Sequence, residues 1–177
     1  MSMSFKPFPW LFLMLALTGC SPTFNWRELR DDAVELQAVM PCKPEQAERQ
    51  VPMAGQMLAL HMHSCEAGGL NFAIAWMRLP DTASAQAVLD PWRMATLATL
   101  QVDRASAADP ALSWPVQVHG ADLARGLQAQ GVAPTGQAIQ VRAAYFTEGA
   151  HAYQAAVYGP QIDHEVAASF FEPLRLP

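Results

Sequence analysis

Two histidines and a cysteine at alternate positions, His61, His63 and Cys65, have the spacing best suited to chemistry. Alternate residues of a β-strand lie on one face, so His61 and His63 could bind one metal ion through their imidazole nitrogens. Two ligands do not complete a metal site, and further ligands would have to come from histidines elsewhere in the chain. These are His119, His151 and His164. The alternative is a polar strand face that is exposed to water or lies under a loop. We therefore predict no cofactor, and we keep His61 and His63 as candidates for a metal or small-ligand site.

Another cysteine, Cys20, follows an apolar run over residues 9–17, with Lys6 as the only charge ahead of the run. A positive start, an apolar middle and small residues at a cleavage point form the order of a secretory signal. The run is too short to cross a bilayer comfortably, because a span takes about 20 residues. The sequence Leu17-Thr18-Gly19-Cys20 closely resembles the lipobox of bacterial lipoproteins.

In lipoproteins with this motif, the cysteine receives a diacylglycerol, a peptidase cuts before it, and the new amino group is acylated. The resemblance implies a signal peptide over residues 1–19 and a lipidated N-terminus with a short tether over residues 20–23. Several acyl chains on Cys20 would anchor the protein stably. Ser21 stands where an aspartate would favour the inner membrane in this family, so we expect a lipid-anchored envelope protein facing the periplasm, with the outer membrane favoured. The alternatives are an ordinary cleaved signal peptide with an incidental Cys20 and an uncleaved anchor.

The two other cysteines, Cys42 and Cys65, are expected to form a disulfide. An exported chain meets an oxidising compartment, where a pair of thiols usually closes. The alternative is two free buried thiols. A catalytic thiol is disfavoured because no charged or histidine-bearing motif lies beside Cys42 to lower its pKa.

Motifs for catalysis and for nucleotide binding are missing from the sequence. It has no Gly-x-Ser-x-Gly and no glycine-rich phosphate loop ahead of a helix. Carboxylates such as Asp122 and Glu148 could pair only through the fold. The net charge of −5 does not favour nucleic acid as a partner. We therefore expect a protein that is not an enzyme.

Hydrophobic periodicity predicts strands, then a helical segment, then strands and a final helix. Strands are expected at 24–29, 34–40, 49–53, 56–65, 70–79, 139–147 and 150–158, with a further strand considered at 115–119. Residues 124–129 fit a strand or a helix, and their alternation favours a strand. Residues 82–102 are good helix formers interrupted by Pro91, which predicts two short helices or one kinked helix. Asp163 is expected to cap a last helix with Phe170 and Phe171 on its apolar face. The order predicts an α+β fold, an antiparallel sheet of about six or seven strands with a helical crossover and a C-terminal helix packed on it.

The segments at 153–159 and 165–176 resemble the ending of PsbP/Mog1-like domains, in which a Tyr-Gln-apolar strand precedes a helix ending in two phenylalanines. Pro173-Leu174 stands where Ser-Phe is usual. The segments at 20–28 and 40–44 look like those of a group of uncharacterised proteobacterial lipoproteins. The resemblance implies one domain over residues 24–177 and a non-catalytic binding or assembly role with a protein partner in the envelope. The alternative is a periplasmic metal or small-ligand binding protein that uses His61 and His63.

Overall fold

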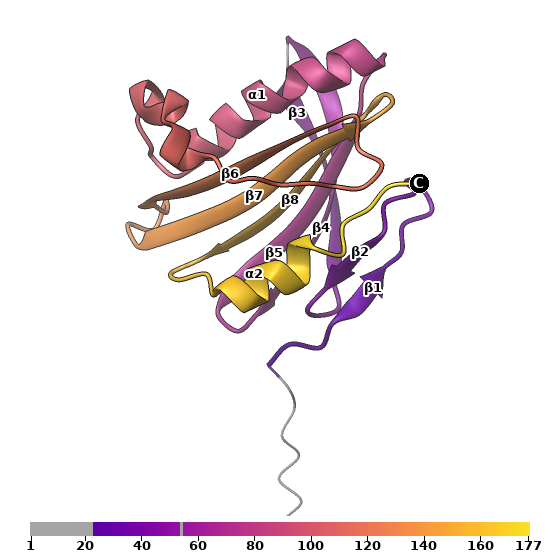
Figure 1. Cartoon of the computed structure of the whole chain (residues 1–177). Helices are drawn as coiled ribbons and strands as arrows, with labels where there is room; N and C mark the ends of the chain where they lie inside the picture. The colour runs from indigo at the N-terminus through magenta and orange to yellow at the C-terminus, as the bar shows by residue number, and fades with distance from the viewer. Residues whose placement is uncertain (1–22, 54) are drawn as a thin grey trace, which may run out of the picture.

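A six-stranded antiparallel sheet forms the centre of the computed structural model, which describes residues 23–53 and 55–177. The strand order is β3-β4-β5-β8-β7-β6. The strands are β3 (Glu45–Met53), β4 (Gln56–Ala67), β5 (Leu70–Arg78), β6 (Leu123–Val132), β7 (Ala138–Glu148) and β8 (His151–Gly159). Helix α1 (Thr82–Thr99) covers one face, whereas α2 (His164–Phe171) and a small sheet of β1 (Arg27–Leu29) and β2 (Ala38–Met40) cover the other (Figure 1). The predicted α+β class is confirmed.

The sheet consists of two three-stranded meanders that meet at β5 and β8. The expected strands at 56–65 and 70–79, and those at 139–147 and 150–158, form hairpins, because β4 pairs with β5 and β7 pairs with β8 in antiparallel register. The turn between β4 and β5 uses Gly68, whose φ of +60° is a conformation that glycine adopts without strain. Residues of β5 and β8 are buried on both faces, as their nearly continuous apolar sequences predict.

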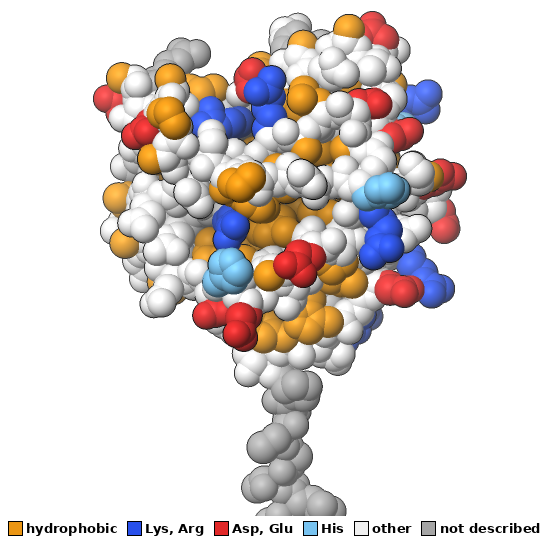
Figure 2. All heavy atoms as spheres, in the orientation of Figure 1, with side chains coloured by type: hydrophobic (Ala, Val, Ile, Leu, Met, Phe, Trp, Pro, Cys, Tyr) orange, Lys and Arg blue, Asp and Glu red, His pale blue; other side chains and the backbone are white. Residues whose placement is uncertain are grey.

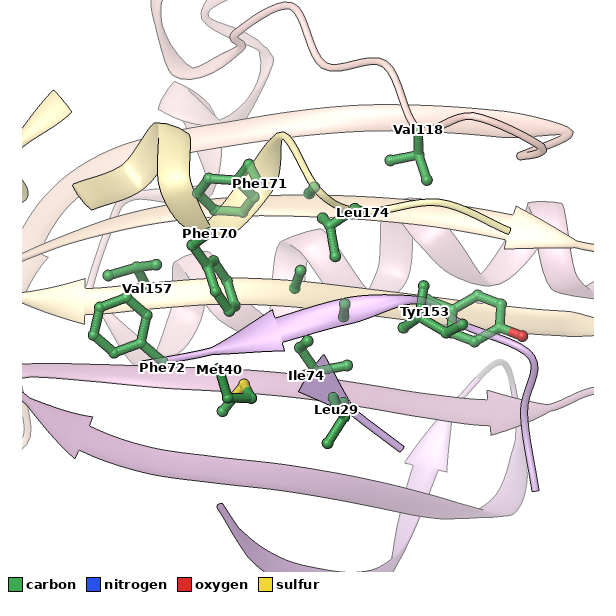
Figure 3. Packing of buried hydrophobic residues seen from close by; sticks show 14 of the residues in the cluster. Leu29, Met40, Phe72, Ile74, Val118, Tyr153, Val157, Phe170, Phe171 and Leu174 are labelled. Carbon is green, nitrogen blue, oxygen red and sulfur yellow. The ribbon is translucent and has the colours of Figure 1, made fainter. Parts of the chain in front are cut away.

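The core on the α2 side is built from large apolar side chains of the sheet, α2 and the small sheet (Figure 3). Phe72 and Phe170 are fully buried and meet edge to face at 5.3 Å. Met40 of β2 is also fully buried, so the small sheet is part of the core. Leu174 extends this core beyond the end of α2. Phe170 and Phe171 both lie on the buried side of α2, as predicted.

Helix α1 is one continuous helix with Pro91 inside it. Asp81 caps its start by accepting a hydrogen bond from the Ser84 amide at 2.7 Å. Pro91 lies on the exposed side, whereas Val88, Leu89 and Trp92 are buried against the sheet. The helix therefore tolerates the proline because burial of its apolar face stabilises it across the interruption.

The N-terminal strands β1 and β2 are shorter than predicted. Each has only three residues, and the two strands pair with each other and not with the main sheet. The second strand is preceded by Gln37, whose backbone bonds to Arg175 of the C-terminal tail. The expected strand at 115–119 is absent from the described structure except for a single bridge between His119 and Arg175. Two short 3₁₀ helices, η1 (Arg104–Ala108) and η2 (Pro110–Leu112), precede that segment. Alternating polarity did not distinguish extended loops from paired strands, because strand pairing depends on which other segment of the protein lies alongside.

Strand β3 begins at Glu45, four residues earlier than expected, and β6 continues through Val132, three residues beyond the expected strand. Beyond these differences the sheet has the predicted order of elements. The side chains of greatest functional interest lie on β4, under the loop between β1 and β2.

Candidate functional site

The disulfide between Cys42 and Cys65 fastens the small sheet to the main sheet. Cys42 follows β2, and Cys65 lies near the end of β4 with a Cα–Cα distance of 6.0 Å. The bridge closes a loop with a sequence separation of 23 residues, which stabilises a fold by about 3 kcal/mol in the chain-entropy model. The predicted disulfide is thus present, and Cys65 offers no thiolate.

His63 lies beneath the loop that joins β1 to β2. Its side chain is only 4% exposed, and its Nε2 lies 2.7 Å from Oδ2 of Asp31 in that loop. An ionised carboxylate only accepts hydrogen bonds, so the His63 ring donates through Nε2–H. The other ring nitrogen, Nδ1, is buried and has no hydrogen-bond partner among the described residues.

Trp76 of β5 completes the contacts of the Asp31 carboxylate. Its indole Nε1 donates to the same oxygen, Oδ2, at 3.3 Å, and the Ala33 amide donates to Oδ1 at 2.9 Å. Burial alone would raise the pKa of Asp31, but the hydrogen bonds from His63, Ala33 and Trp76 outweigh it and hold that pKa below its ordinary value. The ionised loop carboxylate is therefore stabilised by groups of the sheet.

His61 stacks on the indole of Trp76 with ring centroids 4.0 Å apart. Its Nδ1 lies 3.4 Å from a carboxylate oxygen of Glu48 on the neighbouring strand β3. His151 of β8 approaches the same indole edge to face at 6.1 Å. Trp76 is therefore contacted by two histidines and one aspartate, and we call Asp31, Glu48, His61, His63 and Trp76 the histidine cluster.

A shallow pocket of about 190 Å³ lies at the histidine cluster, lined by Asp31, Glu48, His61 and His63 together with neighbouring residues of β3 and β4. A small polar group placed there would contact two carboxylates and the His61 ring. The described part of the chain contains no group of three or more His, Cys, Asp or Glu side chains arranged to hold a metal ion. His63 engages Asp31 through one nitrogen and buries the other, which leaves the metal hypothesis without a second accessible imidazole in this conformation.

An Asp–His pair can also serve as the base of a hydrolase, which needs a nucleophile at the free ring nitrogen. Here that nitrogen is buried. Ser64 is adjacent in sequence, but successive side chains of a strand lie on opposite faces. The pair therefore holds the loop between β1 and β2 on the sheet.

The other residues singled out from the sequence lie apart from the histidine cluster. Asp122 accepts a hydrogen bond from the Gly149 amide at 2.9 Å, which brings it to the turn beside Glu148. Glu148 lies 3.9 Å from a ring nitrogen of His151. His119 belongs to the bridge with the C-terminal tail, and His164 begins α2. Cys20 lies outside the described residues.

Sequence reasoning did not find Asp31 and Trp76 as partners of His63. Asp31 is 32 positions away from His63 in the chain, so no local pattern connects the two residues. The register of the hairpin between β4 and β5 places Trp76 opposite His61.

Comparisons of the chain with protein-family models, with curated proteins and with solved structures gave no match. Neither helix in the described ranges is long and apolar enough to span a bilayer.

Proposed function

We propose that this chain is a lipid-anchored lipoprotein of the bacterial cell envelope, facing the periplasm, and that its domain over residues 24–177 binds a protein partner without catalysing a reaction. The lipobox at Cys20 supports the anchor. The disulfide supports an oxidising compartment, because such bonds persist in exported proteins. The burial of His63 Nδ1 supports a binding role over a hydrolytic one.

The observation that carries this proposal is how soon the fold begins after Cys20. Phe24 already packs against Trp26 and Phe72, with ring centroids 5.9 and 6.3 Å away. Phe24 also covers the turn between β4 and β5, because a Cβ added at Gly68 would lie 2.6 Å from its ring. Four residues of extended chain span at most about 14 Å. A lipid on Cys20 would therefore hold this end of the domain against the membrane surface.

The face that carries α2 presents a mixed polar and apolar surface. Acidic, basic and histidine side chains are interspersed on it with apolar atoms between them (Figure 2). Interfaces of non-obligate complexes are about as apolar as the rest of a protein surface and have a polar rim. This supports a protein partner over an extended polyanion, which would favour a continuous basic patch.

The anchor is tested with Cys20→Ala in cells that express the full chain. We expect the variant to lose its lipid and leave the membrane fraction, while Ser21→Ala, which keeps the cysteine, remains there. Membrane fractionation and metabolic labelling with a fatty acid analogue measure the two effects. Retention of Cys20→Ala in the membrane with unchanged mobility would refute lipid anchoring.

The binding role is tested by photo-crosslinking in intact cells, with the crosslinker placed in turn at exposed Gln50 on β3, Gln128 on β6 and Glu172 after α2. We expect one position to capture a single abundant protein and the others not to do so. Capture of nothing from any position, with the protein present and anchored, would count against a protein-binding module.

A further inference from the structure

Four polar side chains gather on the α2-facing side of the sheet, where β6 and β7 form its edge. They are Gln128, Gln130, Gln140 and Arg142. In the register of these strands, Gln128 lies opposite Arg142 and Gln130 opposite Gln140. Side chains opposite each other on one face are direct neighbours. They line a pocket of about 390 Å³ together with Ala111, Leu112 and Ile162, which we call the Arg142 pocket.

Arg142 is a half-buried cation without an anionic partner in the described structure. Within the described residues, no carboxylate oxygen lies within 4.0 Å of the Arg142 guanidinium. By contrast, Arg30 and Arg125 contact carboxylates at 3.2 and 3.7 Å. Its Nε is buried and has no acceptor among the described groups. A guanidinium has five N–H donors and no acceptor. The terminal N–H groups of Arg142 also make no hydrogen bond with the described residues, and they are not among the buried unpaired atoms, so they are the donors open to a ligand.

Trp114 holds the guanidinium in place. The Arg142 Cζ lies 4.2 Å from the centre of the indole ring, a cation–π geometry. The indole itself is fixed, because Nε1 donates to the carbonyls of Leu127 and Ala143 at 3.2 and 3.0 Å. Gly126 makes room for this arrangement, since a Cβ there would lie 2.2 Å from the Trp114 carbonyl oxygen. The cation is therefore positioned by stacking, which leaves its N–H groups for a ligand.

Two of the three glutamines are oriented by hydrogen bonds to the backbone. The Gln140 Oε1 accepts from the Ile162 amide at 3.1 Å, which leaves its NH₂ group as a free donor. The Gln128 Nε2 donates to the Ala111 carbonyl at 3.1 Å, which leaves its Oε1 as an acceptor. Gln130 is exposed and makes no such bond within the described residues. The pocket thus combines one cation with neutral donors and acceptors at fixed places.

We propose that the Arg142 pocket binds a ligand that carries a carboxylate, with Arg142 contacting the carboxylate and Gln130 and Gln140 bonding to a neighbouring polar group such as an amide. A planar guanidinium matches a carboxylate through two parallel hydrogen bonds. Two sources present this chemistry, a small free organic acid and the C-terminus of a peptide. The site is separate from the histidine cluster and does not depend on lipidation of Cys20.

The test uses the purified full chain in detergent and isothermal titration calorimetry. The probes are succinate, acetyl-trialanine with a free carboxyl terminus, the same peptide with an amidated terminus, and inorganic phosphate. We expect one of the first two to bind and the amidated peptide not to bind. Arg142→Gln should weaken binding at least about tenfold, as loss of a charge-assisted hydrogen bond predicts.

Arg49→Gln is the matched control, because it removes the same charge from an exposed position on the opposite edge strand β3. It should bind the probe as the unmodified protein does. If Arg142→Gln fails to fold, Gln130→Ala carries the test, because Gln130 is exposed and makes no hydrogen bond within the described residues. Its affinity for the probe should fall while its melting temperature stays unchanged.

Binding by succinate alone identifies a small acid as the source, and binding by the free peptide alone identifies a carboxyl terminus. The proposal is overturned if neither carboxylate binds, if only phosphate binds, or if the amidated peptide binds as well as the free one. It is also overturned if Arg142→Gln and Arg49→Gln lose affinity to the same extent.

Discussion

The carboxylate of Asp31 joins the loop between β1 and β2 to two strands of the main sheet. It accepts hydrogen bonds from His63 of β4 and Trp76 of β5. If Asp31 were removed, the buried Nε2–H of His63 would lose its hydrogen-bond acceptor, and burial limits replacement of that acceptor by water. The side chain is 21% exposed, so the pair is shielded only in part from solvent.

Replacing Asp31 with Asn keeps the shape of the side chain and removes its charge. We expect a loss of about 1–3 kcal/mol in the free energy of unfolding, because a charge-assisted hydrogen bond becomes a neutral one and the amide group can orient poorly. Urea denaturation measures the change. Asp32→Asn, at the exposed neighbouring position, should change stability very little, and equal losses in the two variants would contradict the assignment.

The stability gap between these two variants should narrow in acid. The pKa of Asp31 is held below its ordinary value of 3.8 in the folded state. A group with a depressed pKa contributes stability that is complete above its unfolded-state pKa and is lost as the pH falls through the folded-state pKa. The stability difference between the unmodified protein and Asp31→Asn should therefore be constant near neutral pH and shrink as the pH falls through 3.8 and below.

At the scale of elements, α1 is attached to the sheet by a polar contact within an apolar interface. The Thr96 hydroxyl accepts from Tyr145 at 2.7 Å and from Gln154 at 3.2 Å, and Gln154 also donates to the Tyr145 hydroxyl at 3.0 Å. All three side chains are buried. Burial raises the pKa of Tyr145, so the phenol stays protonated and donates. The network orients α1, because only one position of the helix places Thr96 over both partners.

Thr96→Val tests this network with little change in volume. Removing the hydroxyl leaves the buried Tyr145 O–H without its acceptor, so we expect a loss of about 1–3 kcal/mol in the free energy of unfolding. Thr99→Val is the control, because Thr99 is exposed and its hydroxyl bonds only to the Ala95 carbonyl of the same helix. That change should stay within about 0.5 kcal/mol. Thermal unfolding monitored by circular dichroism compares the two variants. A smaller loss of stability in Thr96→Val than in Thr99→Val would refute the stabilising role of the network.

At the scale of the whole molecule, the packing of Phe24 would orient the domain of the proposed lipoprotein on the membrane. The turn between β4 and β5 lies beside Phe24, so in the proposed lipoprotein this turn faces the bilayer. Strand β4 runs from Gln56 to Ala67. Its two ends are therefore separated by roughly 33–36 Å, from a rise of about 3.3 Å per residue.

This orientation predicts different lipid proximity for labels at the two ends of β4. Fluorophores on Glu66→Cys and Gln56→Cys, both at exposed positions, are compared in vesicles that contain quencher-bearing lipids. We expect strong quenching at position 66 and little at position 56, because the distance between them exceeds the reach of contact quenching. The reverse order, or equal quenching, would contradict the orientation.

The candidate site illustrates how far local sequence reasoning reaches. The alternation in β4 correctly placed His61, His63 and Cys65 on one face, because the period of a strand is two. The partner of His63 could not be found in this way, since Asp31 reaches it only after the loop between β1 and β2 folds over the sheet. The Arg142 pocket was missed for the same reason, because Trp114 comes from a segment with no regular period.

The sequence by itself determined the order of the elements, the two hairpins, the capped last helix and the disulfide, because each depends on local period, turn chemistry or the small number of cysteines. It also carries the lipobox on which the anchoring proposal rests. Only the tertiary structure decided that α1 continues through Pro91, that β1 and β2 form a separate sheet, and that His63 is buried under Asp31. These outcomes depend on contacts between residues distant in sequence, where the free energy of burial outweighs local preference.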